Sequence, residues 1–257
     1  EIASVCDEFE DRQLVFEFYP DEQLGDIYEQ YRQVIHAHPR GSAFFMEHRH
    51  MSWHAQNTRD AILEYMHRSV GNAIPFFCLG NHDQPRVVSR LDYERARALN
   101  FLNLLTPGIS VVYYGDEIGM ENGVLDATQL RDNFSPANST VDSRDLERTP
   151  MQWSDSQFAD FSTAEPWLPV HANRVSVNVA KQTNETRSML TMHQTLLKLR
   201  QAMPILVHGS LEAVDVGNGF ILGLKRVFRG QRAYIFINFA SAEQYIHLPE
   251  PCQIITS

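Results

Sequence analysis

Short apolar runs and amphipathic stretches follow one another along most of the chain. Runs without polar alternation are typical of strands buried on both faces, whereas apolar positions three and four residues apart are typical of helices. The predicted strands span residues 13–18, 42–46, 74–79 and 109–114. The predicted helices span residues 21–34, 56–70, 92–105 and 187–200, with Asn57 or Thr58 as N-cap of the second and Asp92 of the third. This succession predicts a parallel α/β architecture.

The pattern changes after His208. Alternating apolar and polar residues, separated by turns, predict strands at 209–214, 220–224, 233–238 and 244–248. Such alternation is typical of antiparallel strands with one buried face. We therefore predict two domains, an α/β domain over residues 1–205 and an incomplete antiparallel β-domain over residues 206–257.

Composition and charge argue against several classes of protein. Of the 257 residues, 22 are basic and 32 are acidic, which gives a net charge of −10. A negative balance argues against a nucleic-acid partner or an anionic membrane surface. No run approaches the roughly 18 apolar residues of a membrane-spanning helix, so no membrane partner is predicted within the chain.

Cysteines and histidines predict neither a disulfide framework nor a bound metal or cofactor. Cys6, Cys78 and Cys252 are far apart and odd in number, which favours a reducing, cytoplasmic location. Three histidines lie within residues 48–54, but no cysteine or aspartate there completes a ligand set. We interpret this segment as a solvated loop.

The predicted strand 74–79 ends at Gly80 and is followed at once by Asn81, His82 and Asp83. Polar groups at the carboxyl end of a buried parallel strand lie where α/β folds build their sites. A plain turn is the alternative, because these residues are also good turn formers. Metallophosphoesterases carry Gly-Asn-His-Asp too, but the Asp-x-His, Gly-Asp-x-x-Asp and Gly-His-x-His segments that they require are absent. Sugar recognition remains, because an aspartate beside a histidine can hold two hydroxyls of one ring.

A lone acidic residue, Glu17, interrupts the apolar run 13–18. A carboxylate in such a strand is unfavourable unless it is paired or faces a polar cavity. Phe16 and Phe18 flank it and would limit its hydration, which suits a group that donates a proton. The alternative is an edge-strand glutamate that faces solvent.

Several long motifs in this order resemble the α-glucosidase and oligo-1,6-glucosidase branch of the α-amylase family. The motifs are FFCLGNHDQPRVVSR at 76–90, YYGDEIGM at 113–120, SRDLERTPMQW at 143–153, PWLP at 166–169 and NVAKQ at 178–182. The resemblance implies strands five to eight of a (β/α)8 TIM barrel over residues 1–205, with a long loop at 121–169. Residues 206–257 then correspond to a truncated antiparallel β-sandwich domain.

The resemblance also implies roles in retaining hydrolysis of an α-glucosidic bond. Glu17, in a Glu-x-Tyr context, corresponds to the general acid/base. His82 and Asp83 would grip ring hydroxyls and stabilise the oxocarbenium-like transition state. Arg144 would contact the innermost glucose, with a loop salt bridge as the alternative. A final group is expected to support the loop rather than to act in catalysis: Asp116, Glu117, Arg148, Gln152 and Trp153.

The nucleophile of this family is an aspartate in a Gly-Phe-Arg-x-Asp context on the strand before the acid. Asp7 and Asp11 lack that context. We therefore expect the nucleophile and the inserted domain of the family upstream of this chain, which would be inactive alone. Two alternatives remain: a glucosyl-transferring isomerase of sucrose-like disaccharides, and a non-catalytic homologue such as a transporter heavy subunit. Those subunits lack an intact Asn-His-Asp, which favours an enzyme here. Linkage preference and oligomeric state are not predicted.

Overall fold

The computed structural model describes residues 2–47, 53–132 and 143–256. The chain divides into two compact units, each assembled from separate segments. Unit 1 contains Glu1–Phe77, Leu105–Ile109 and Met203–Ser257. Unit 2 contains Cys78–Leu104 and Ser110–Ala202.

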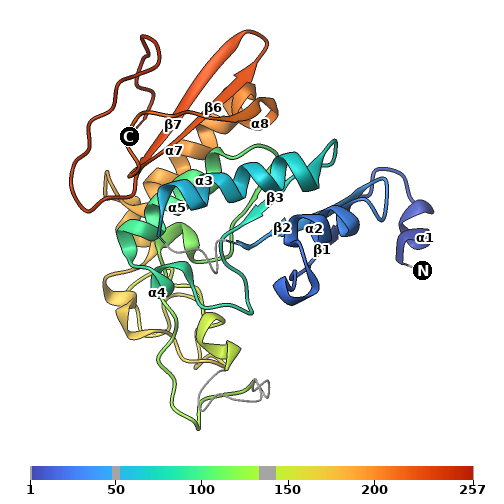
Figure 1. Cartoon of the computed structure of the whole chain (residues 1–257). Coiled ribbons are helices and arrows are strands. Elements are labelled where there is room, and N and C mark those ends of the chain that lie inside the picture. The colour runs from blue at the N-terminus through green and yellow to red at the C-terminus, as the bar shows by residue number, and fades with distance from the viewer. Residues whose placement is uncertain (1, 48–52, 133–142, 257) are drawn as a thin grey trace. The chain divides into compact units, whose positions relative to one another are not determined.

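Unit 1 contains β1, β2, most of β3 and the first residue of β4 of a four-stranded sheet that is built from the predicted apolar runs (Figure 1). The four strands are β1 (Leu14–Phe16), β2 (Gly41–Phe45), β3 (Phe76–Cys78) and β4 (Ile109–Val111), in that spatial order. β1 pairs with β2 and β2 with β3, both in parallel. The start of β4 joins through the amide N–H of Ile109, which donates to the carbonyl of Pro75 at 2.9 Å. The parallel α/β prediction is thus confirmed, although the strands are shorter than predicted.

Aromatic side chains fill the core beside this sheet. The Phe45 ring stacks on Tyr65 with centroids 4.5 Å apart, and Phe77 and Tyr31 meet Tyr65 edge-on at 5.6 Å and 5.4 Å. All four side chains are fully buried. Offset and edge-to-face packing of this kind adds about 1 kcal/mol per pair to the burial of the rings.

Two helices of unit 1 differ from the prediction. The stretch 21–34 is divided at Gly25, whose φ of 116° lies outside the helical region. The 3₁₀ helix η1 (Glu22–Leu24) precedes it, and α2 (Ile27–Ile35) begins after the N-cap Asp26. The prediction of one continuous helix is therefore wrong.

The second predicted helix begins earlier than the sequence suggested. Helix α3 (Ala55–Glu64) has His54 as its N-cap, not Asn57 or Thr58, and continues into the π-helical turn η3 (Tyr65–Val70). The Nδ1 atom of His54 accepts from the Asn57 amide at 3.5 Å. The other two histidines of the 48–54 segment lie outside the described residues. The remaining helices of unit 1 are α1 (Ile2–Asp7) and α8 (Pro204–His208).

An antiparallel three-stranded sheet forms the rest of unit 1. Its strands are β5 (Ser210–Ala213), β6 (Ile221–Phe228) and β7 (Gln231–Asn238), with β6 in the middle. The prediction of a strand at 244–248 is wrong, because that stretch forms no helix or strand. Trp53 covers the end of the sheet: its ring stacks on Phe239 at 4.1 Å, and its indole N–H donates to the Phe239 carbonyl at 2.8 Å.

One fully buried cation, Arg226 on β6, satisfies the backbone around it. Its guanidinium donates to four main-chain carbonyls, each 2.8–2.9 Å away, those of Leu105, Leu206, Gly209 and Ser210. Each of these carbonyls would lose a partner without the guanidinium, and buried polar groups without partners are costly.

Replacing Arg226 by methionine is expected to lower the free energy of unfolding by about 3 kcal/mol or more. Urea unfolding followed by circular dichroism measures the loss. The matched control is Arg232→Met on β7, because Arg232 is exposed and its guanidinium binds the Glu250 carboxylate at 2.6 Å rather than buried carbonyls. That variant should lose about 1 kcal/mol or less. Equal losses would show that the carbonyl contacts do not govern stability.

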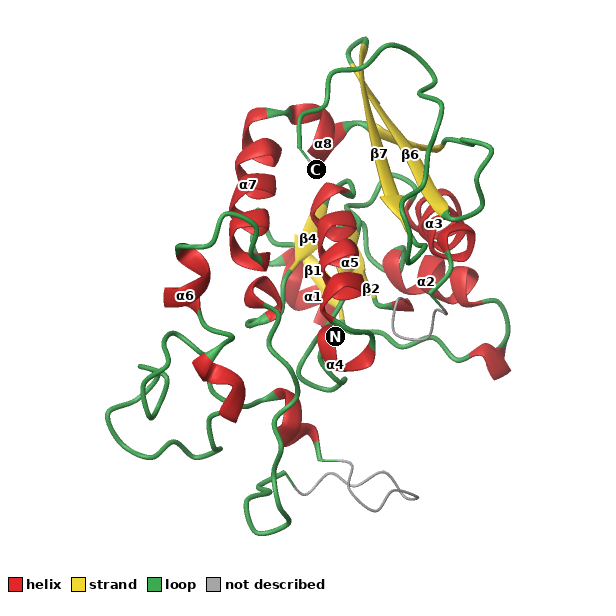
Figure 2. Ribbon diagram, turned by 90° about the vertical axis from the view of Figure 1, so that its left-hand side faces the viewer, coloured by secondary structure: helices red, strands yellow, loops and turns green. Residues whose placement is uncertain are grey.

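Helices are the main regular elements of unit 2, and long loops connect them (Figure 2). Its longer helices are α5 (Tyr93–Leu105) and α7 (Met189–Ala202), joined by shorter elements: α4 (Val87–Arg90), α6 (Val179–Thr183), and the 3₁₀ helices η4 (Asp116–Ile118), η5 (Arg144–Glu147) and η6 (Ala172–Val175). Asp92 caps α5 as predicted, since its Oδ1 accepts from the Arg95 amide at 2.8 Å. The Arg200 guanidinium ties α7 to α5 through the Leu104 carbonyl at 2.7 Å.

Within the ranges that the structure describes, every helix is too short or too polar to cross a membrane.

Candidate active site

The turn after β3 presents the residues that the sequence placed there. β3 and Leu79 are buried, and the polar residues follow directly. The Asn81 side-chain oxygen accepts from the Asp83 amide at 3.0 Å, which closes a local turn. As a result His82 is exposed, and Asp83 is half-buried.

Two arginines converge on the Asp83 carboxylate. Its Oδ1 atom lies 3.0 Å from Nη1 of Arg144 and 2.8 Å from Nη2 of Arg148. The ring Nε2 of His82 is 3.4 Å from the same oxygen. Charge-assisted contacts from two planar guanidinium groups fix the position of a carboxylate better than one flexible cation would.

A second carboxylate, Asp132, holds Arg144 from the other side. Arg144 Nε and Nη2 donate to the two Asp132 oxygens at 2.6 Å and 3.1 Å. The hydrogen bonds that Arg144 donates to Asp132, and then the one that it donates to Asp83, raise the pKa of the Arg144 guanidinium, although burial opposes the shift. The buried carboxylate of Asp145 anchors this stretch, because it accepts from the amides of Arg131 and Asp132 at 2.5 Å and 2.7 Å.

Arg148 has contacts with the His82-Asp83 pair that the sequence did not predict. It was predicted only to support the loop, but it contacts both members of the His82-Asp83 pair. Besides the Asp83 carboxylate, it binds the His82 carbonyl through Nε at 2.8 Å. The one available signal was its spacing: Arg148 comes four residues after Arg144, where Arg144 is the first residue of η5 and Arg148 is its C-cap. Nothing in the sequence indicated Asp132 or Asp145.

The cluster suits recognition of a neutral polyol. An exposed imidazole and a guanidinium can donate to hydroxyl groups, and a fixed carboxylate stabilises positive charge that develops nearby. Within unit 2, the two guanidinium groups beside Asp83 oppose a metal cation at that carboxylate.

Glu17 belongs to unit 1 and directly follows β1. It is exposed, and its Oε1 accepts from the Tyr19 hydroxyl at 2.8 Å, so the two ends of the Glu-x-Tyr segment are in contact. Asp7 is engaged elsewhere: it lies 3.0 Å from His38 and 3.2 Å from Arg40.

Unit 2 also buries the ionisable side chains of Arg86, Asp116 and Glu147, at and near the turn after β4. Arg86 is fully buried, with its guanidinium carbon 4.7 Å from the Tyr114 ring centroid and 5.1 Å from that of Tyr113. Burial raises the pKa of Asp116 from its ordinary 3.8 to about 7, although Arg86 opposes the shift. Burial also raises the pKa of Glu147 to about 7.

Asp116 is expected to make unit 2 less stable as the pH rises. The pKa of Asp116 is higher in the folded state than in the unfolded state. Its contribution to the free energy of unfolding is therefore fully present below about pH 4, where the carboxyl is protonated in both states. That contribution is lost as the pH rises to about 7, at up to about 1 kcal/mol per pH unit. Asp116→Asn should remove this part of the slope and leave the part due to Glu147. Urea unfolding between about pH 5 and pH 7 measures both slopes.

The control for this prediction is Asp126→Asn, because Asp126 is exposed and hydrogen bonds from Thr128 lower its pKa. That substitution should not change the slope over the same pH range. An unchanged slope in Asp116→Asn would show that Asp116 is ionised throughout.

Fold and site together define a parallel α/β protein with a fixed carboxylate, an exposed histidine and two arginines at the end of a buried strand. Comparison with known families agrees: the family described as alpha amylase, catalytic domain, matches residues 4–209. The chain therefore belongs to the α-amylase family.

Its relatives lie in the branch that the motifs indicated, which confirms the resemblance. It is 38% identical to Maltase 1 of Drosophila virilis over 65% of this chain and 27% of that protein. It is 33% identical to an alpha-glucosidase of Apis mellifera (69% and 32%), and 30% to an oligo-1,6-glucosidase of Bacillus cereus (66% and 35%). The chain thus spans about a third of the length of these curated relatives.

Solved structures of similar fold include a trehalulose synthase. The trehalulose synthase MutB of Pseudomonas mesoacidophila superposes with a TM-score of 0.75 at 25% identity. The match covers 90% of this chain and 48% of that one.

Proposed function

We propose that the full-length protein is a retaining α-glucosidase that acts on short oligosaccharides or disaccharides. The observation that supports this most is the Asp83 carboxylate, fixed by Arg144 and Arg148 beside an exposed His82. Relatives from the maltase and oligo-1,6-glucosidase group carry names that state the same activity.

The proposal assigns a part in catalysis or binding to each of these residues. Glu17 protonates the leaving glycosidic oxygen and later removes a proton from the attacking water. Asp83 and His82 bind ring hydroxyls and strengthen that hold as positive charge develops on the sugar. Arg144 bridges Asp83 and Asp132 with hydrogen bonds and contacts the innermost glucose. An aspartate outside this chain supplies the nucleophile, so residues 1–257 alone are inactive.

The proposal also assigns the two observed sheets to a barrel and a sandwich. The α/β part, over residues 1–205, is the second half of a (β/α)8 barrel, and residues 206–257 belong to an antiparallel β-sandwich. The family match over residues 4–209 and the superposition on MutB support it. A cytoplasmic location, based on the cysteine content, stays a prediction.

The activity is tested by giving the full-length protein maltose, isomaltose, sucrose and p-nitrophenyl α-glucoside. Proton NMR of the first product decides between mechanisms, because retaining cleavage releases α-glucose before mutarotation. Release of β-glucose would contradict a retaining mechanism. A protein inert on all four substrates would favour the non-catalytic homologue.

A glucosyl-transferring isomerase is the second candidate, and the structural likeness to a trehalulose synthase favours it. The two candidates differ in what sucrose becomes. A hydrolase releases glucose and fructose, whereas an isomerase forms a rearranged disaccharide. Chromatography of the sucrose products separates them.

A further inference from the structure

A buried acidic side chain, Glu147, lies in the sequence between the two arginines that hold Asp83. Glu147 is the last residue of η5, Arg144 is the first, and Arg148 is the C-cap. Only 4% of Glu147 is exposed. Carboxylates are seldom buried so completely unless they are paired. The part that Glu147 plays beside Asp83 therefore needs an explanation.

Both the backbone and the side chain of Glu147 are held in place. Its carbonyl accepts from the Tyr113 hydroxyl at 3.2 Å, and its Oε2 accepts from the side-chain amide of Asn122 at 3.4 Å. Asn122 is itself fixed, because its Oδ1 accepts from the Arg86 amide at 2.7 Å and its backbone N–H donates to the Ser89 hydroxyl at 2.7 Å. The hydrogen bond to the carboxylate is long, so it compensates little for the loss of water around a negative charge.

Several charged groups act on the Glu147 carboxylate. Burial raises its pKa to about 7, the charges of Arg148 and Arg86 oppose the rise, and the charge of Asp83 adds to it. The Tyr113 hydroxyl stays neutral, because burial raises its pKa as well. Glu147 therefore changes its charge near neutral pH, whereas the two arginines and the tyrosine keep theirs.

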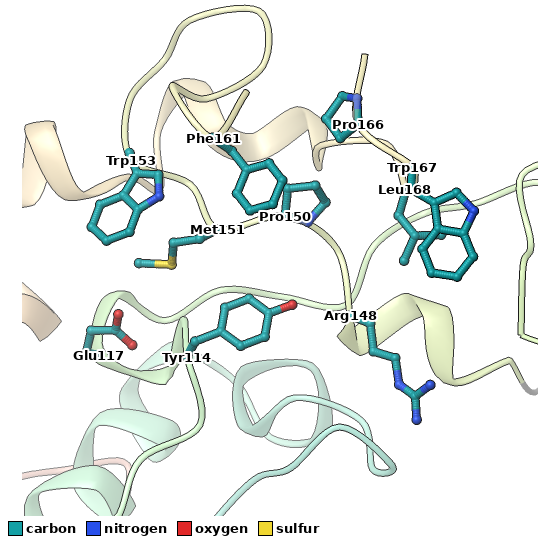
Figure 3. Close-up of a pocket in the computed structure, with 10 residues that line it drawn as sticks. All are labelled: Tyr114, Glu117, Arg148, Pro150, Met151, Trp153, Phe161, Pro166, Trp167 and Leu168. Carbon is teal, nitrogen blue, oxygen red and sulfur yellow. The ribbon is translucent and has the colours of Figure 1, made fainter. Parts of the chain in front are cut away.

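The Arg148 guanidinium connects Glu147 with the candidate site. Figure 3 shows a pocket on this loop, and the guanidinium points away from its aromatic rings. It binds the Asp83 carboxylate and the His82 carbonyl, each at 2.8 Å. Electrostatic coupling is reciprocal: because Asp83 disfavours a charge on Glu147, an ionised Glu147 makes the surroundings of Asp83 more negative. An ionised Glu147 also attracts Arg148, which then neutralises Asp83 less completely.

We propose that Glu147 is a positioning residue whose negative charge, acting through Arg148, strengthens the interaction of Asp83 with a sugar that gains positive charge. Charges that are fixed in advance around a developing cation stabilise the transition state without any new contact. Above about pH 7 Glu147 is ionised and this effect is present, whereas at lower pH it is lost. The catalytic effect rests on the proposed function, but the link between Glu147 and Arg148 does not.

Nitrogen-15 NMR of the Arg148 side chain in the full-length protein tests the link without any substrate. The Nε and Nη resonances report the bonds of the guanidinium, and Arg148→Lys identifies them. In the wild type they should shift with a midpoint near pH 7. In Glu147→Gln, which keeps the size and the acceptor but not the charge, they should stay constant. Resonances that respond to pH equally in both proteins, or in neither, would overturn the proposal.

Kinetics on p-nitrophenyl α-glucoside measures the catalytic effect, because this leaving group depends little on the proton from Glu17. The ratio of kcat/KM in the wild type to kcat/KM in Glu147→Gln cancels the titrations that both proteins share. We expect this ratio to rise from about one at about pH 5 to about ten at about pH 8. A purely structural role would give the same ratio at every pH, and that result would overturn the proposal.

Two further variants are matched controls. Glu147→Asp keeps the charge on a shorter side chain, so it should show the pH dependence of the wild type in both measurements. Glu185→Gln makes the same chemical change at an exposed acid of unit 2, and its ratio should stay at about one at every pH. Circular dichroism checks the fold of each variant. If Glu147→Gln does not fold, Glu147→Ala replaces it in both measurements.

Failure of the proposed function is distinguishable from failure of this inference. Arg148 resonances that depend on Glu147 in a protein without glucosidase activity would uphold the link and refute only the catalysis. The same resonances in an active enzyme whose kcat/KM ratio does not change with pH would overturn the positioning role of Glu147.

Discussion

Glu17→Gln in the full-length protein is expected to lower kcat for maltose by about three orders of magnitude. Glutamine keeps the size of the side chain and its acceptor for the Tyr19 hydroxyl, but it cannot donate a proton to the leaving oxygen. Maltose has a poor leaving group and depends on that proton. p-Nitrophenolate leaves without it, so the first step on the aryl glucoside should suffer much less.

Steady-state kinetics on both substrates, with and without azide, measures the effect. Azide needs no general base, so it should restore breakdown of the glycosyl-enzyme and yield α-glucosyl azide. Glu22→Gln is the matched control, because Glu22 is an exposed acid on η1, and it should keep full activity. Maltose hydrolysis that survives Glu17→Gln would show that another residue is the acid.

Asp83→Asn is expected to reduce kcat for maltose by about a thousandfold, with a much smaller change in KM. The amide keeps the shape but removes the negative charge that faces the developing oxocarbenium. A group that acts mainly in the transition state changes kcat more than it changes KM. Kinetics on maltose gives both values.

Asp132→Asn separates this role from simple positioning. Both carboxylates bind Arg144, but only Asp83 also neighbours His82. If Asp83 acts only by holding the arginines, the two variants should lose similar activity. We expect a clearly smaller loss for Asp132→Asn. Circular dichroism and urea unfolding check that both variants fold.

The fold could be predicted where burial alone decides the pattern. The apolar runs at β1 to β4 and the Asp92-capped α5 needed no tertiary information. The prediction failed where one residue overrides the periodicity. Gly25, at φ 116°, ends a stretch whose apolar spacing is helical on both sides. At 244–248 alternation was present, but no strand formed, because pattern does not supply a pairing partner.

The site was predictable only in part, for a related reason. His82 and Asp83 follow a buried strand, so their position can be read from local sequence. The contacts of Arg148 with that pair span 65 and 66 residues. No local pattern encodes contacts at such separation. Asp132 was missed for the same reason, because its partner Arg144 is brought to it by the anchor at Asp145.

The discontinuity of unit 1 has a consequence for synthesis on the ribosome. Its first segment, Glu1–Phe77, emerges before any of unit 2, but its last, Met203–Ser257, emerges after all of it. The Arg226 guanidinium meets the Leu105 carbonyl across 121 positions of the chain. The Glu1–Phe77 segment must therefore wait, with helix α3 not yet covered by β5 and β6, while unit 2 is being made. A ribosome that stalls before residue 203 would leave that side of α3 open to chaperones.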